Sequence, residues 1–70
     1  MRIAGERIKT ARERCGLTQR AVARAIDTTE FRVSKWERSL AQPNAVYLLK
    51  LAQALNVDPR ELADSEGGDQ

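Results

Sequence analysis

The stretch TTEFRVSKWERS, residues 28–39, holds the only Phe and the only Trp of the chain. Phe31 and Trp36 are five residues apart, so a helix through this stretch places them on opposite sides. Val33 shares the side of Trp36, which predicts that this side faces a core. The other side brings together an aromatic ring, a hydroxyl group and charged groups: Phe31, Ser34 and Lys35, flanked by Glu30 and Arg32.

This outward side is typical of a helix that reads base edges in the major groove of DNA, where thymine presents a methyl group to apolar side chains. Phe31 could instead fold over a neighbouring helix or lie in a protein interface, and Lys35 could be an ordinary surface lysine. We interpret both as DNA contacts. Glu30 stays open, because the helix dipole alone favours an acid there, whereas a base-reading Glu would accept from cytosine N4. Ser34 and Arg32 are further candidates, Arg32 for a phosphate.

The sequence offers no set of catalytic side chains. It has no His and a single Cys, so it supplies neither a metal site nor a nucleophile–base pair. Gly67 and Gly68 lie in a polar segment without a strand before them or a helix after them, which argues against a phosphate-binding loop. We therefore expect a protein that binds rather than catalyses, with no cofactor and no metal. Cys15 is interpreted as a small buried hydrophobe at the end of the first helix.

The composition is that of one small domain. The 70 residues are 41% hydrophobic and 31% charged, and no apolar run approaches the roughly 20 residues that span a membrane. No signal-peptide pattern is present, which predicts a cytoplasmic protein without a membrane contact. Residues 1–38 carry ten Lys and Arg against five Asp and Glu, and residues 39–70 carry two against five. The balances of +5 and −3 sum to +2 and indicate either a surface for a polyanion or a chance scatter of solvated charges.

Helical spacing recurs along the chain, and no segment alternates like a strand. We predict helices at residues 3–15, 19–26, 30–38 and 45–55, followed by a short fifth helix that starts from a capping box at residues 58–61. Besides Val33 and Trp36, the side chains expected inside are Ile8, Ala11, Cys15, Val22, Ala23, Ile26, Leu48, Leu51, Ala52, Leu55 and Leu62. Residues 1–63 are interpreted as the domain, and residues 64–70 as a disordered tail or the start of a linker.

Helix-capping and helix-terminating residues mark the predicted helix ends. Side chains that cap helices stand at the starts: Thr18, Thr29, Asn44 and Asp58. Residues that tolerate a left-handed backbone stand at the ends: Gly16, Asp27 and Asn56. The second and third helices are thus two short rods joined by a tight turn at Asp27.

Two stretches resemble the phage-repressor/Cro-type helix-turn-helix family, often called XRE-like. They are LTQRAVARAIDTTEFRVSKWERS at residues 17–39 and PNAVYLLKLAQALNV at residues 43–57. The residues that carry the resemblance are Leu17, Thr18, Gln19, Ala23, Ile26, Val33, Trp36, Glu37 and Arg38. The resemblance covers about residues 3–63 and implies an all-α fold, a compact five-helix lambda-repressor-like DNA-binding domain whose second and third helices form the helix-turn-helix. Asp27 and Ser39 depart from it, since the family has Gly at both positions.

The resemblance also implies roles for single residues. Glu30, Phe31 and Lys35 occupy base-reading positions, and Ser34 lies on the same outward side. The resemblance places phosphates at the start of the second helix and along the loop after the third helix, at Thr18, Gln19, Arg38 and Asn44. Arg32 is added as a phosphate contact from its own place beside the outward side. Glu37 matches a position that pairs with an arginine of the first helix, and Arg12 is that arginine here.

The resulting hypothesis is a sequence-specific transcriptional regulator that binds double-stranded DNA as a dimer on a roughly palindromic operator. The last segment is polar, so we expect a weak homodimer that forms chiefly on DNA. The alternative is a protein-interaction module on the same fold, such as a small antitoxin or the N-terminal domain of a longer protein. Val46, Tyr47 and Leu49 cannot all be buried, and they would supply the contact patch of such a module.

Overall fold

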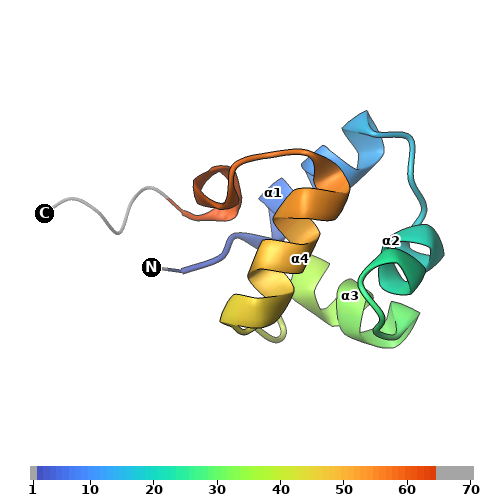
Figure 1. The fold of residues 1–70 in the computed structure, drawn as a ribbon. Coiled ribbons are helices and arrows are strands. Elements are labelled where there is room, and N and C mark those ends of the chain that lie inside the picture. The colour runs from blue at the N-terminus through green and yellow to red at the C-terminus, as the bar shows by residue number, and fades with distance from the viewer. Residues whose placement is uncertain (1, 65–70) are drawn as a thin grey trace, which may run out of the picture.

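The computed structural model describes residues 2–64, which form helices and one isolated β-bridge. The elements are α1 (Gly5–Arg14), α2 (Gln19–Ala25), α3 (Glu30–Glu37), α4 (Ala45–Leu55) and the 3-10 helix η1 (Pro59–Leu62) (Figure 1). The predicted all-α class is confirmed. The fifth helix is a 3-10 turn rather than an α-helix, because Asp58 caps its start and Ala63 already pairs with Ile3 beyond its end.

Side-chain caps set the starts of α2, α3, α4 and η1, as the sequence predicts, whereas Ala4 before α1 supplies no side-chain cap. Each capping oxygen accepts a hydrogen bond from the backbone N–H three residues further on: Thr18 at 3.0 Å, Thr29 at 3.2 Å and Asn44 at 2.9 Å. Asp58 and Glu61 form the predicted capping box of η1. The side-chain and backbone hydrogen bonds from Arg60 lower the pKa of the Asp58 carboxyl below its usual value.

Left-handed residues end the helices and turn the chain. Their φ angles are 72° at Gly16, 61° at Asp27, 61° at Ser39 and 57° at Asn56. Asp27 and Ser39 hold this conformation without being glycine, which short polar side chains tolerate better than branched ones. At both turns a backbone N–H reaches back five residues, from Thr28 to Ala23 O at 2.8 Å and from Leu40 to Lys35 O at 2.9 Å. These bonds satisfy carbonyl groups at the ends of α2 and α3 and hold the two turns.

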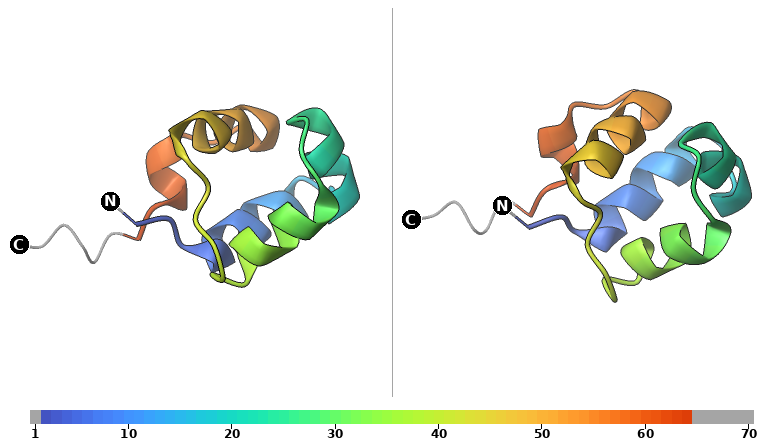
Figure 2. Two further views of the ribbon diagram at one scale, coloured as in Figure 1. Left: turned by 90° about the horizontal axis from the view of Figure 1, so that it is seen from below. Right: turned by 60° about the horizontal axis from the view of Figure 1, so that its bottom comes forward.

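The core is aliphatic and includes one indole ring. Its buried side chains come from every helix and from the N-terminal segment: Ile3, Ile8, Ala11, Val22, Ala23, Ile26, Val33, Trp36, Leu48, Leu51, Ala52, Leu55, Leu62 and Ala63. With the exception of Cys15, every side chain predicted inside belongs to this set. In the left view of Figure 2, α4 lies on one side of the molecule and α1 and α3 lie together on the other.

The residues before Gly5 are extended and pair with other parts of the chain, instead of forming the first turn of α1. The sequence predicts α1 from residue 3, but the helix begins at Gly5. The preceding residues pair with the end of η1, where Ala4 N–H donates to Leu62 O at 2.9 Å. Gln42 holds the same segment from the other side, because its side-chain amide accepts from Ile3 N–H and donates to Ile3 O, both at 2.9 Å. The loop between α3 and α4 is thereby fixed to the N-terminus.

Cys15 does not occupy the buried position that the sequence predicts. α1 ends at Arg14, so Cys15 is its C-cap residue and leaves the buried side defined by Ile8 and Ala11. The side chain is exposed. Its Sγ–H donates a hydrogen bond to Leu55 O at 3.3 Å, which connects the end of α1 to the end of α4 without burying the sulfur.

The two ends of the described chain meet away from α2 and α3 (Figure 1). Asp64 N–H donates to Arg2 O at 2.7 Å, so Asp64 is part of the folded unit. The remainder of the predicted tail, residues 65–70, lies outside the described residues. Within the described part of the chain, no helix combines the length and the hydropathy needed to cross a bilayer.

Candidate nucleic-acid interface

α3 has the two-sided character that the sequence predicts. Val33 and Trp36 are buried in the core, whereas Phe31 is 66% exposed. Glu30 and Arg32 are also exposed, and Ser34 and Lys35 are half-buried. The rest of the molecule therefore holds α3 from behind and leaves its outward side free, at the end of the molecule that α2 and α3 form together (Figure 1).

Phe31 and Lys35 form one unit on the outward side of α3. The Lys35 ammonium lies 5.2 Å from the centroid of the Phe31 ring. The two residues are one helical turn apart, so the four-residue spacing lets the long side chain reach back over the ring. This unit presents an apolar face and a cation at the same place, which is a combination that base edges and phosphates in a groove can accept.

A buried ion pair fixes α3 from behind. Arg12 Nε donates to Glu37 Oε2 at 2.6 Å, and Arg12 Nη2 donates to Glu37 Oε1 at 3.1 Å. The Arg12 and Glu37 side chains are only 12% and 3% exposed. Arg12 Nη1 also donates to Leu17 O at 2.8 Å, just before α2. The expected pair is thus present and joins α1, the start of α2 and the end of α3. The hydrogen bond to Glu37 raises the pKa of Arg12 above its usual value, although burial opposes this shift.

Gln19 belongs to the same network. Its Nε2 donates to Glu37 Oε1 at 3.0 Å, so the amide nitrogen is engaged inside the protein. One N–H of that amide is therefore occupied, and the other remains a donor. The backbone N–H groups of Gln19 and Arg20, in the first turn of α2, have no intrahelical acceptor and are further donors at this point. Thr18 adds a hydroxyl, because Oγ1 accepts from Ala21 and keeps its own O–H as a donor.

Arg38 and Asn44 border the loop after α3. Arg38 Nε donates to Ser34 O at 3.4 Å, which holds the exposed side chain along the end of the helix. Asn44 is exposed, and its Oδ1 caps α4 through the backbone N–H of Tyr47. Among residues 2–64, no acceptor engages the two Nη groups of Arg38 or the amide nitrogen of Asn44. These donors remain for a ligand or for water.

The structure shows a contact between α3 and α4 that the sequence analysis did not predict. The half-buried ring of Tyr47 lies 5.3 Å, between centroids, from the ring of Trp36. The guanidinium carbon of Arg32 lies 5.3 Å from the Tyr47 centroid and 6.0 Å from the Trp36 centroid. Lys50 approaches the same tyrosine, with its Nζ 5.8 Å from the centroid. Arg32 and Tyr47 belong to different helices, so no local sequence pattern signals this arrangement.

The apolar patch expected on α4 is smaller than the sequence suggests. Val46 and Leu49 are 60% and 57% exposed, but Tyr47 turns toward Trp36 and is half-buried. The patch therefore consists of two aliphatic side chains on one side of the helix.

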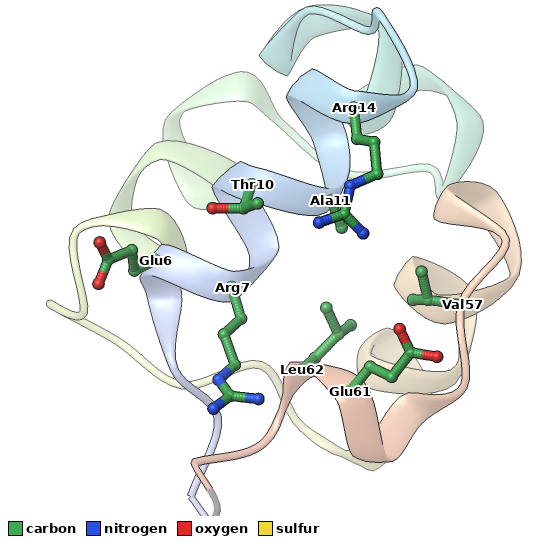
Figure 3. Close-up of a pocket in the computed structure, with 8 residues that line it drawn as sticks. All are labelled: Glu6, Arg7, Thr10, Ala11, Arg14, Val57, Glu61 and Leu62. Atoms are coloured by element: carbon green, nitrogen blue, oxygen red, sulfur yellow. The ribbon is translucent and has the colours of Figure 1, made fainter.

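A separate groove of about 330 Å³ opens between α1 and η1 (Figure 3). Charged side chains surround an apolar floor, and the lining residues are Glu6, Arg7, Thr10, Ala11, Arg14, Val57, Glu61 and Leu62. Neither α2 nor α3 contributes to it. In the part of the chain that the structure describes, no group of three or more His, Cys, Asp or Glu side chains is arranged to hold a metal ion.

Comparison with known proteins gives one family. The helix-turn-helix family model matches residues 8–62. Repressor protein C2 of Salmonella phage P22 is 35% identical over 57 residues, which are 81% of this chain and 26% of that protein. The HTH-type transcriptional regulator DicA of Escherichia coli K12 is 36% identical over 55 residues, which are 79% of this chain and 41% of that protein. The chain thus spans about a quarter of the first relative and about two fifths of the second.

The structural comparison agrees with the sequence comparison. The crystal structure of the P22 c2 repressor protein in complex with a synthetic operator matches with a TM-score of 0.84 and 33% sequence identity. The match covers 91% of this chain and 97% of that chain.

Proposed function

Because this chain belongs to the helix-turn-helix family, we propose that it is a DNA-binding transcriptional regulator that reads the major groove with α3. The observation that carries the proposal is the exposed Phe31 ring, with the Lys35 ammonium 5.2 Å from its centroid, on a helix whose other side is fixed by Val33 and Trp36. On the second helix of a helix-turn-helix, an outward-facing aromatic ring beside a cation suits apolar contact with thymine methyl groups in the major groove. The similarity to a repressor structure that contains operator DNA supports the same function.

α3 has dimensions that suit the major groove. An α-helix with its side chains is about 10–12 Å across, which matches the roughly 12 Å width of the groove, and the eight residues of α3 make a rod about 12 Å long. Phe31 would contact a thymine methyl, and Lys35 would donate to guanine O6 or N7 or to a phosphate. Glu30 would accept from cytosine N4, and Ser34 would serve either base or backbone.

Backbone contacts would surround this base-reading unit. We assign them to the start of α2, to the exposed side of α3 and to the loop after it, with Thr18, Gln19, Arg32, Arg38 and Asn44 as the residues. Thr18 and the N–H groups of α2 would hold a phosphate, and Gln19 would act mainly by holding Glu37. Such contacts fix the register of α3 on the duplex, whereas base contacts decide which sequence is bound.

The regulator would bind as a dimer on a palindromic operator, in the cytoplasm. Two copies of α3 would enter successive major grooves about 34 Å apart. The segment after α4 offers little apolar area, because Asp58 and Arg60 are exposed and pair with each other at 3.2 Å. We therefore expect a weak dimer that forms chiefly on DNA.

Selection from random duplexes at near-physiological salt tests the proposal. A palindromic consensus with a thymine at the position that Phe31 contacts is the expected result. Salt-sensitive binding without a consensus would overturn sequence-specific recognition, because only phosphate contacts would then remain.

The second candidate is a protein-interaction module on the same fold. The exposed aliphatic pair Val46 and Leu49 favours it. In that case Val46→Ser with Leu49→Ser would abolish partner binding in a pull-down, while Phe31→Ala would leave it unchanged. The opposite pattern would exclude this module.

A further inference from the structure

Arg32 and Lys50 are cations held over one tyrosine ring. The guanidinium carbon of Arg32 lies 5.3 Å from the centroid of Tyr47, and Lys50 Nζ lies 5.8 Å from it. In the described part of the chain, neither cation forms an ion pair with an acidic side chain. Two cations that share one ring and have no carboxylate leave a local positive charge without compensation.

Tyr47 is itself fixed to the core. Its ring packs against Trp36 at 5.3 Å between centroids, with an angle of 47° between the planes. Trp36 is buried on the inner side of α3, and Tyr47 lies in the first turn of α4. The ring therefore moves with the core and provides a rigid surface at the junction of the two helices.

This surface restricts Arg32. A guanidinium that lies over an aromatic face keeps its N–H groups at the edge, where they remain able to donate. An unrestrained arginine side chain would lose several rotatable bonds when it binds a phosphate, and the ring removes part of that loss in advance. The forked N–H groups of arginine suit phosphate oxygens in particular.

We infer that Tyr47 is a positioning residue for DNA binding, which holds the Arg32 guanidinium at the α3–α4 junction so that Arg32, together with Lys50, clamps one phosphate of the duplex. This inference rests on the proposed function and adds two residues to it, Tyr47 and Lys50. Tyr47 itself touches no DNA in this arrangement. The Arg32 side chain contacts the DNA backbone, and Phe31 and Lys35 contact the bases.

Affinity for a mixed-sequence duplex of about 25 base pairs, measured over a range of salt concentrations, tests the inference. Tyr47→Leu keeps an apolar side chain against Trp36 but removes the ring, and we expect it to weaken binding about three- to tenfold. Tyr47→Phe keeps the ring and is the matched control, with affinity close to that of the unaltered protein. Arg32→Ala should weaken binding and make the salt slope shallower by about one unit.

The double variant separates positioning from a purely structural role. If Tyr47 acts through Arg32, Tyr47→Leu will have almost no further effect in the Arg32→Ala background. If the same loss appears in both backgrounds, or if Tyr47→Leu binds like the unaltered protein, the inference is wrong. An unaltered protein that binds no duplex at all would overturn the proposed function as well, so the two failures are distinguishable.

A measurement on the unaltered protein covers the case in which Tyr47→Leu fails to fold. The rings of Tyr47 and Trp36 should shift the NMR signals of the Arg32 side-chain protons upfield. Arg38 provides the internal reference, because its guanidinium lies over no aromatic ring of residues 2–64. Arg32 signals at the same positions as those of Arg38 would overturn the inference.

Discussion

At the residue level, substitution of Phe31 should affect DNA binding much more than the stability of the fold. Because Phe31 is about two thirds exposed to water, Phe31→Ala removes little buried area. We expect the free energy of unfolding to change by less than about 0.5 kcal/mol. Binding to the selected operator should weaken by about 1–3 kcal/mol, with relaxed preference at one base pair. Urea unfolding and titration with the labelled operator measure the two quantities on the same sample.

Uracil in place of thymine provides the matched control on the DNA side. The exchange removes only the C5-methyl group and keeps every hydrogen bond of the base pair. At the position that Phe31 contacts, it should weaken the unaltered protein but leave Phe31→Ala unaffected. An unaltered protein that tolerates uracil at every position of the operator would contradict the contact.

The Arg12–Glu37 pair is a residue-level feature on which stability depends. The sequence leaves open whether this pair is buried, and the answer changes the expected cost of losing one partner. Because Glu37 is 3% exposed, Arg12→Ala would leave a buried carboxylate without its cation. Gln19 would remain as a neutral hydrogen-bond donor to it. We expect a loss of about 3 kcal/mol in the free energy of unfolding, at the low end for buried pairs because 12% of Arg12 remains exposed.

A double substitution distinguishes stranded charge from lost packing. Arg12→Met with Glu37→Leu removes both charges and keeps apolar volume, so urea unfolding should show that most of the lost stability returns. If the double variant is less stable than Arg12→Ala, the pair itself is a net source of stability and the stranded-charge explanation is wrong.

At the level of elements, Gly5 determines how closely α1 approaches α3. A Cβ at this position would lie 2.5 Å from the carbonyl oxygen of Glu37 and closer still to that of Trp36. Gly5→Ala improves helix propensity, but backbone atoms cannot move aside as a flexible side chain could. We expect a net destabilisation of about 1–3 kcal/mol, measured by thermal or urea unfolding.

Gly16→Asn is the matched control for Gly5→Ala. Gly16 has φ of 72° and open space where a Cβ would lie, so the substitution meets no neighbouring atom. Asn also tolerates this backbone conformation better than most residues. Gly16→Asn should therefore lower the free energy of unfolding clearly less than Gly5→Ala does. Equal losses at the two positions would show that close approach is not the cause.

Elements defined by near neighbours in the chain could be predicted from the sequence. The caps at Thr18, Thr29 and Asn44 act over three residues, and the spacing of Val33 and Trp36 defines the buried side of α3 directly. The same spacing exposes Phe31, so the main feature of the candidate site follows from periodicity.

Features that depend on distant residues could not be predicted in this way. Ile3 leaves the expected helix because Ala63 and Gln42 hold it, and these partners are far along the chain. Cys15 is exposed because α1 ends one residue earlier than periodicity suggests. The stacking of Arg32 on Tyr47 depends on the packing of α4 against the core, which no local pattern in the sequence shows.

At the level of the whole molecule, α2 and α3 lie at one end, and the two ends of the described chain, at residues 2 and 64, meet away from them (Figure 1). If α3 reads the major groove as proposed, a dimer that spans successive grooves must form from parts beside the end that contains α2 and α3. The exposed pair Val46 and Leu49 is small, and the polar segment after α4 adds little. Stable complexes bury at least roughly 1,200 Å² in total, and two exposed aliphatic side chains on α4 with Leu40 on the loop after α3 supply little of that area. The free protein is expected to be monomeric at micromolar concentration in sedimentation experiments.

DNA would then supply the missing free energy of dimerisation. Two copies on adjacent half-sites are held at a high effective concentration, so even a weak contact makes binding cooperative. The cooperativity depends on both copies facing the same side of the duplex, which repeats about every 10 base pairs. Insertion of about five base pairs between half-sites turns one copy to the opposite side, and titration should then show two independent, weaker events. A single half-site gives the reference affinity for one copy. Equal cooperativity with and without the insertion would exclude a direct contact between the copies.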